Sequence, residues 1–110
     1  MSAPRPHHLT AGQRTRRRLV SALNEITRSS VAEIRITPAR YGDGTVWCAM
    51  ALTAGRREVP LPGHARQVAS LIREAFPLAD WSRAQDYHVT SGVLREHVTP
   101  MPAALNGGER

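Results

Sequence analysis

The sequence predicts a single α+β domain in which two helices pack on an antiparallel β-sheet. Two segments have apolar residues at helical spacing, and the stretches between and after them alternate apolar and polar residues between glycine and proline turns. The predicted order is α-β-β-β-α-β-β, a three-stranded meander and a C-terminal hairpin. We assign residues 10–98 to this domain, with a flexible N-terminal arm of residues 1–9 and a flexible C-terminal tail of residues 99–110.

The first predicted helix covers about residues 11–28. Thr10 and Gln13 match a capping box, in which each side chain binds a free backbone donor of the other residue. The apolar residues share one face of this helix: Leu19, Ala22, Leu23 and Ile26. The opposite face carries Ser21, Glu25 and a row of arginines: Arg14, Arg17, Arg18 and Arg28. The helix is therefore expected to have an apolar face and an arginine face.

Three strands are expected between the helices. Residues 32–37 alternate apolar and polar side chains, and we expect Pro38 to end this strand or mark a bulge, because proline has no N–H for the ladder. After a glycine-rich turn, residues 45–53 form a strand that is apolar on both faces, which favours a central position. Residues 56–61 form a short third strand, which Pro60 marks as an edge.

The second helix is expected over about residues 64–76, because Pro62 and Gly63 interrupt the chain before it and Pro77 ends it. The last element is a hairpin over residues 81–98 around Ser91-Gly92. The hydrophobic phase favours a two-residue turn there, although a three-residue turn with a left-handed glycine remains open.

Two histidines and an aspartate share the polar face of the predicted hairpin. In the favoured register Asp86 lies opposite His97, and His88 lies diagonal to His97, so a two-histidine, one-carboxylate metal site is conceivable. Local spacing fixes no third ligand, and exposed strands carry such residues routinely, so we expect no metal site. Cys48 lies among apolar residues, which predicts a buried structural cysteine and no reactive thiolate.

The chain lacks the local motifs of common enzymes and cofactor sites. It has no phosphate-binding glycine loop, no zinc-ligand spacing, no HExxH and no GxSxG. We therefore expect no enzymatic activity, no cofactor and no small-molecule substrate. The single cysteine permits no intramolecular disulfide and is typical of a cytoplasmic protein. No apolar run approaches the length of a membrane span, so we expect no membrane partner.

Positive charge is concentrated near the N-terminus. The net charge is +6, and residues 1–30 hold six arginines and one acid, whereas residues 31–110 hold nine arginines and eight acids. This asymmetry predicts a polyanionic partner, since arginine binds phosphate through a planar fork of donors. All 15 basic residues are arginine, as a GC-rich genome would produce, but that bias does not explain the clustering.

We therefore expect a small non-enzymatic nucleic-acid-binding or regulatory protein, with DNA in preference to RNA as its partner. The residues expected to contact phosphates come from the first helix and the N-terminal arm: Arg5, Arg14, Arg16, Arg17, Arg18 and Arg28. The alternative is a protein-interaction module, such as a homodimer. Such a module would use the edge strand at residues 56–61 or the face that carries Trp81 and Tyr87.

The helix, three strands and helix of residues 10–76 resemble double-stranded-RNA-binding domains in their order. The second helix of that family begins with a lysine cluster, whereas Pro62-Gly63-His64-Ala65-Arg66 stands here. The family's loop motif between the first strands is also missing. The resemblance therefore extends to the order of elements alone, and no RNA-binding residue is carried over from it.

Overall fold

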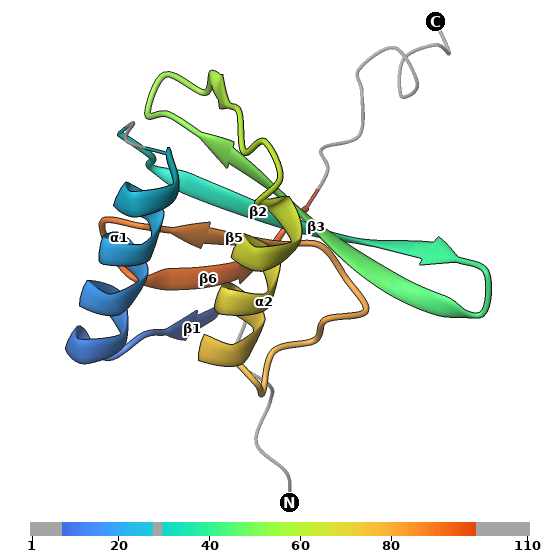
Figure 1. The fold of residues 1–110 in the computed structure, drawn as a ribbon. Coiled ribbons are helices and arrows are strands. Elements are labelled where there is room, and N and C mark those ends of the chain that lie inside the picture. The colour runs from blue at the N-terminus through green and yellow to red at the C-terminus, as the bar shows by residue number, and fades with distance from the viewer. Residues whose placement is uncertain (1–7, 28–29, 99–110) are drawn as a thin grey trace, which may run out of the picture.

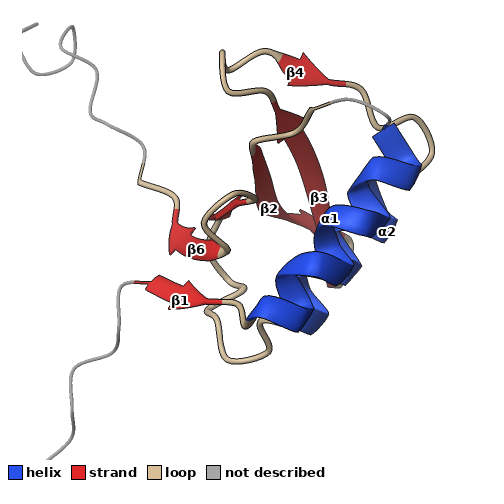
Figure 2. Ribbon diagram, turned by 90° about the vertical axis from the view of Figure 1, so that its left-hand side faces the viewer, coloured by secondary structure: helices blue, strands red, loops and turns tan. Residues whose placement is uncertain are grey.

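The computed structural model describes residues 8–27 and 30–98, which form two helices and one six-stranded sheet. The elements follow one another as β1 (His8–Thr10), α1 (Gln13–Thr27), β2 (Glu33–Tyr41), β3 (Gly44–Leu52), β4 (Glu58–Val59), α2 (Ala65–Ala75), β5 (Gln85–His88) and β6 (Val93–Glu96). The antiparallel strands lie in the order β1-β6-β5-β2-β3-β4. Both helices cover the same face of the sheet (Figures 1 and 2). The predicted α+β class is confirmed.

One row of apolar side chains crosses all six strands on the helix side of the sheet. Its members lie opposite one another in neighbouring strands: Leu9, Leu94, Tyr87, Ile34, Ala51 and Val59. All of them are buried except Leu9, which is half-buried. A slip of one residue in any strand would turn its apolar side chains to the other face, so this row specifies the register of the sheet.

Each helix buries the apolar face that its sequence predicts. Leu19 and Leu23 of α1 are buried, and so are Val68, Ala69 and Ile72 of α2. Neither described helix has the length and the apolar composition needed to cross a membrane.

The start of α1 differs from the prediction. The helix begins at Gln13, whereas Thr10 belongs to β1 and pairs with Val93, so the expected capping box between Thr10 and Gln13 is wrong. The Arg16 N–H instead donates to the Gly12 carbonyl over 2.9 Å. His8 and Leu9, which the sequence assigned to the arm, form strand with Thr10. A three-residue strand is too short to show the alternation from which strands are predicted.

β2 continues to Tyr41, past the proline that was expected to end it or to form a bulge. β3 pairs with β2 along its whole length, whereas β5 pairs with β2 only as far as Ile36. Pro38 therefore lies where β2 has a described strand on one side only, and a missing N–H is tolerated there. Beyond this point the β2–β3 hairpin extends away from the rest of the sheet (Figure 1).

The C-terminal hairpin has a four-residue loop, residues 89–92, in place of the predicted two-residue turn. Tyr87 pairs with Leu94, so the register differs by two residues from the expected one. A shift of two keeps each side chain of β5 and β6 on its predicted face, although the predicted partners are wrong. Gly92 closes the loop with a left-handed φ of +73°, and its N–H donates to the His88 carbonyl over 2.8 Å.

Trp81, which was expected to begin the hairpin, lies in the loop before β5. Its Nε1 donates to the Phe76 carbonyl over 2.9 Å, and its own carbonyl accepts a 2.7 Å bond from Trp47 Nε1. The two indoles therefore attach this loop to the end of α2 and to β3.

Because the described helices cover one face of the sheet, the prediction that Cys48 is buried is wrong. Cys48 lies on the uncovered face and is exposed, and Met50 on the same face is also exposed. The sequence showed that both faces of β3 are apolar, but it could not show that one of them lacks a covering helix. β3 is also not fully central, because β4 pairs with it only at Ala51 and Leu52.

Candidate nucleic-acid interface

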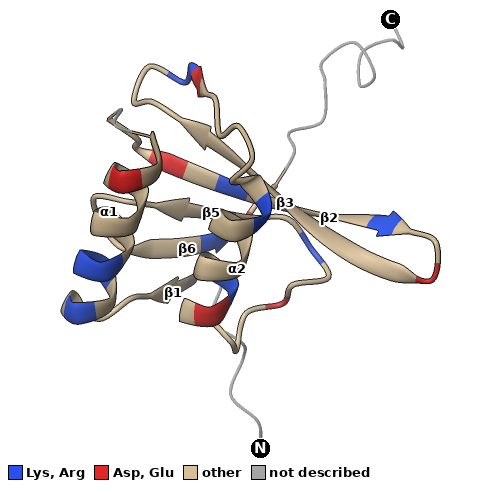
Figure 3. Cartoon of the chain, viewed as in Figure 1, with Lys and Arg blue, Asp and Glu red and all other residues tan. Residues whose placement is uncertain are grey.

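Three arginines project from the side of α1 that faces away from the sheet. Arg14, Arg17 and Arg18 are exposed, whereas Leu19 and Leu23 are buried against the core. Basic residues occupy the N-terminal half of α1, and its one acid lies near the other end (Figure 3). We call Arg14, Arg17 and Arg18 the arginine face.

The arginine face is not neutralised within the described part of the chain. The ion pairs found there join Arg35 and Arg83 to carboxylates and His97 to Asp86, and none of them includes an arginine of α1. These guanidinium groups are therefore open to solvent and have no carboxylate partner in residues 8–27 and 30–98.

The arginine face lies at the end of α1 where positive charge is least favourable. The N-terminal end of a helix carries a partial positive charge, so acids stabilise it and bases do not. The first turn of α1 contains no acid, and Arg14, Arg16, Arg17 and Arg18 all lie within its first six residues. The arrangement opposes helix stability, which favours a function for these arginines over a merely solvated face.

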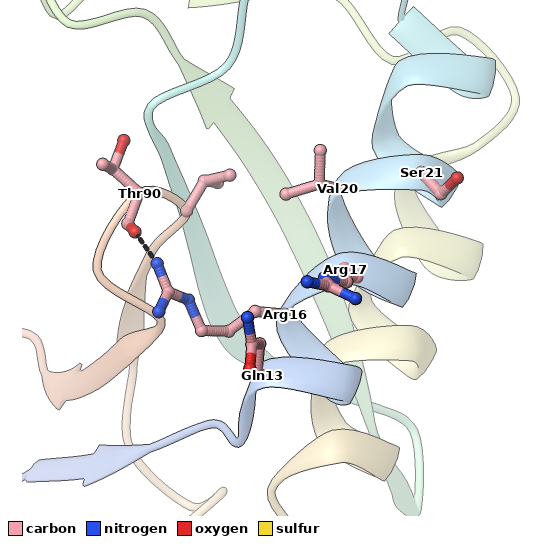
Figure 4. A pocket seen from close by; sticks show the side chains of 7 residues that line it. Gln13, Arg16, Arg17, Val20, Ser21 and Thr90 are labelled. Atoms are coloured by element: carbon pink, nitrogen blue, oxygen red, sulfur yellow. Dashed lines mark hydrogen bonds between the residues drawn. The ribbon is translucent and has the colours of Figure 1, made fainter.

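Arg16 is placed differently from its neighbours. Its Nη2 donates to the Thr90 carbonyl in the β5–β6 loop, so the side chain connects α1 to that loop (Figure 4). A Cβ added to Gly92 would lie 2.5 Å from Arg16 Cδ. The left-handed φ favours glycine at this position, and a larger residue would also force the Arg16 side chain to move. Only part of the Arg16 guanidinium remains to bind a ligand.

A groove of about 530 Å³ lies between α1 and the β5–β6 loop (Figure 4). It has polar and apolar walls, which are formed by Gln13, Arg16, Arg17, Val20, Ser21, Val89 and Thr90. The guanidinium groups of Arg16 and Arg17 lie beside Val20 and Val89 in this lining. Such a surface suits a ligand that joins an anionic group to a less polar group, as a nucleotide joins phosphate to sugar. The sequence did not reveal this groove, because Arg16 and Thr90 are 74 residues apart.

The other arginines of the predicted site cannot be placed. Arg5 and Arg28 lie outside the described residues. The structure thus brings Arg14, Arg17 and Arg18 together on one face, and assigns Arg16 to the wall of the groove.

Tyr87 lies in the core and not on an interaction surface. It is completely buried, and its ring contacts Phe76 with the centroids 5.6 Å apart. Its hydroxyl has no hydrogen-bond partner among the described residues. Burial raises the pKa of Tyr87, and the nearby charge of Arg16 opposes that shift. The alternative interface expected at Trp81 and Tyr87 is therefore wrong, because Tyr87 points into the core.

The uncovered face of the sheet holds a separate cluster of charges around Asp86. Arg35 Nε donates to Asp86 Oδ1 over 2.8 Å, His97 Nδ1 lies 2.7 Å from Asp86 Oδ2, and Arg35 Nη2 lies 3.3 Å from Glu33 Oε2. The hydrogen bond to Asp86 is the main cause that raises the pKa of Arg35, against the opposing effect of burial. The carboxylate of Asp86 thus already has two partners within the fold.

The metal site considered for the hairpin does not form in the described ranges. Asp86 pairs with Arg95 in the ladder, whereas the expected register placed it opposite His97. Among the described residues, no three or more histidines, cysteines or carboxylates gather closely enough to hold a metal ion.

No protein-family model matches the chain, and no curated protein or solved structure is significantly similar to it. The functional interpretation therefore depends on the charge and geometry of α1 and the adjoining groove.

Proposed function

We propose that this protein is a small non-enzymatic nucleic-acid-binding protein whose arginine face contacts the phosphate backbone. The observation that carries the proposal is that Arg14, Arg17 and Arg18 are exposed together and form no ion pair with any described residue. Guanidinium groups form strong, charge-assisted hydrogen bonds with phosphate oxygens. Phosphate contacts of this kind position a protein on nucleic acid without reading its sequence.

Arg17 belongs both to the arginine face and to the wall of the groove. A phosphate bound by Arg17 would lie beside Ser21 and Gln13, whose side chains offer further hydrogen bonds. Arg16 would add charge from a position held by Thr90. Arg5 and Arg28 remain predicted contributors on either side of this segment.

Duplex DNA is the proposed partner in preference to RNA. Proteins that recognise single-stranded RNA commonly stack unpaired bases on aromatic side chains. Neither the arginine face nor the lining of the groove includes an aromatic residue. A helix that presents cations without aromatics is better suited to the phosphates of a duplex, and the major groove of B-form DNA admits a helix, whereas that of A-form RNA is too narrow.

The test is fluorescence anisotropy with labelled duplex DNA at low ionic strength. The triple variant Arg14→Gln, Arg17→Gln, Arg18→Gln should bind at least about tenfold more weakly than the natural protein, which corresponds to about 1.4 kcal/mol. The matched control replaces three exposed arginines outside α1, Arg40, Arg57 and Arg66, with glutamine. It removes the same net charge and should retain most of the affinity.

Equal losses in the two triple variants would show that net charge, and not the arginine face, determines binding. An absence of binding by the natural protein at low salt would remove the proposal. Duplex RNA and single-stranded DNA of the same length serve as competitors, and a preference for either over duplex DNA would contradict the assigned partner.

A further inference from the structure

We propose that two copies of this chain associate through the outer edge of β3, so that their sheets join in one continuous antiparallel sheet. The proposal does not depend on nucleic-acid binding. It rests on the pairing, composition and exposure of the β2–β3 hairpin.

Over half of its length, the outer edge of β3 pairs with no strand of the described residues. β4 pairs with β3 only at Ala51 and Leu52, and the chain after β4 remains beside Ala49, where it lines a shared cavity. From residue 44 to residue 48, no described strand lies against this edge. Five residues of unpaired strand are about 17 Å of backbone, the usual length of a strand in a folded sheet.

β3 lacks the features that protect its neighbours. Proteins shield edge strands with charged residues, prolines or very short strands, because unpaired N–H and C=O groups bind other strands. The free side of β2 carries Pro38 and Arg40, and β4 has two residues followed by Pro60. The nine residues of β3 include no charge and no proline.

An apolar patch adjoins the unprotected edge on the uncovered face of the hairpin. Tyr41 is 72% exposed and Met50 is 38% exposed, and Cys48 lies exposed between them in the ladder. Ala39 and Val46 pair with each other on the same face. Exposed apolar area of this kind, beside a free strand edge, is typical of a surface that another chain covers.

The uncharged composition of β3 suits a second copy as the partner. Each chain has a net charge of +6, so two copies repel each other unless they meet where charge is absent. β3 is such a region, because it has no charged side chain. When β3 pairs with the β3 of a second copy, no two like charges lie opposite each other. A two-fold axis perpendicular to the sheet relates such strands, as in an isologous dimer, and it places the helices of both copies on the same face.

The association is tested by sedimentation velocity over a wide range of protein concentration. The natural protein should form dimers, and Val46→Lys should raise the dimer dissociation constant at least about tenfold, because it places like charges close together across the axis. Cys48→Lys, at a position already exposed, adds a charge to the same uncharged strand and should also weaken the dimer, with little risk to folding. The matched control is Leu78→Lys, at a residue outside the sheet that is 89% exposed.

A protein that stays monomeric up to the concentrations of NMR samples would overturn the proposal. So would a dimer that both β3 variants leave unchanged, or one that Leu78→Lys weakens equally. Circular dichroism of each variant verifies that it is folded. None of these results depends on whether the arginine face binds DNA.

Discussion

Arginine occurs in two opposite settings in this molecule. On the uncovered face of the sheet, Arg35 is held between Asp86 and Glu33, at 2.8 Å and 3.3 Å. On α1, the arginine face has no acidic partner among the described residues and lies at the positive end of its helix. Arginine thus stabilises the fold on the uncovered face of the sheet. On α1 it opposes helix stability and is available for a ligand.

The difference between the two regions predicts different responses to mutation. Removing the partner of an enclosed charge should lower the free energy of unfolding, whereas removing an exposed charge that binds an external ligand should not. Asp86→Ala and the triple variant of the arginine face test this contrast, and Tyr87→Phe tests a buried polar group that carries no charge. They follow from the largest expected effect on stability to the smallest.

Asp86→Ala should destabilise the protein by about 2–3 kcal/mol in urea unfolding, somewhat less than for a fully buried pair. The side chains of Arg35 and Asp86 are only 21% and 13% exposed, so the change leaves a largely enclosed guanidinium with one weak partner. The triple variant Asp86→Leu, Arg35→Met, Glu33→Gln serves as the control and should recover much of the loss, because it removes Arg35 together with both of its carboxylate partners. A loss of stability below about 0.5 kcal/mol in Asp86→Ala is what a surface substitution causes. It would show that Arg35 and the arginine face do not differ in their contribution to stability.

Tyr87→Phe tests a third setting, a buried hydroxyl that has no hydrogen-bond partner in the described part of the chain. Removing the unpaired hydroxyl should stabilise the protein by about 1 kcal/mol, because the hydroxyl loses its hydration on folding and gains no bond within the described residues. A loss of stability in the variant would show that this hydroxyl does have a partner.

The pH dependence of stability follows from the raised pKa of Tyr87. A raised pKa in the folded state means that the stabilisation is complete below the unfolded value of about 10 and is lost as the pH rises toward the folded value. Urea unfolding above pH 10 should therefore show a decline in the natural protein that is smaller in Tyr87→Phe. An equal fall in stability above pH 10 in the natural protein and in Tyr87→Phe would show that Tyr87 does not cause it.

The triple variant Arg14→Gln, Arg17→Gln, Arg18→Gln should have the smallest effect, a change in stability within about 0.5 kcal/mol. Any change should be a gain, because the variant removes cations from the positive end of the helix. Thermal unfolding without nucleic acid provides the measurement. A loss comparable to that of Asp86→Ala would mean that the arginine face is structural.

The elements that the sequence predicted well are those with a long hydrophobic pattern. Both helices and the β2–β3 hairpin were located because each repeats its pattern over many residues. Neither the pairing of β1 with β6 nor the register of the last hairpin follows from local pattern. β1 is too short to show a period, and a shift of two residues leaves the faces of β5 and β6 unchanged.

The candidate site divides in the same way. The exposure of Arg14, Arg17 and Arg18 follows from helical spacing alone. The separate position of Arg16 depends on Thr90 and Gly92, which only the folded chain brings to it. The exposure of Cys48 likewise depends on which face of the sheet the helices leave uncovered, and no local pattern contains that information.

The salt dependence of duplex DNA binding tests the central claim most directly. Each phosphate that an arginine neutralises makes the slope of log K against log salt more negative by about 0.9. If each of the three arginines neutralises one phosphate, the slope of the natural protein should be steeper than that of the arginine-face variant by about 2.7. The control that replaces Arg40, Arg57 and Arg66 should keep the slope of the natural protein. Equal slopes for the natural protein and the arginine-face variant would contradict the account.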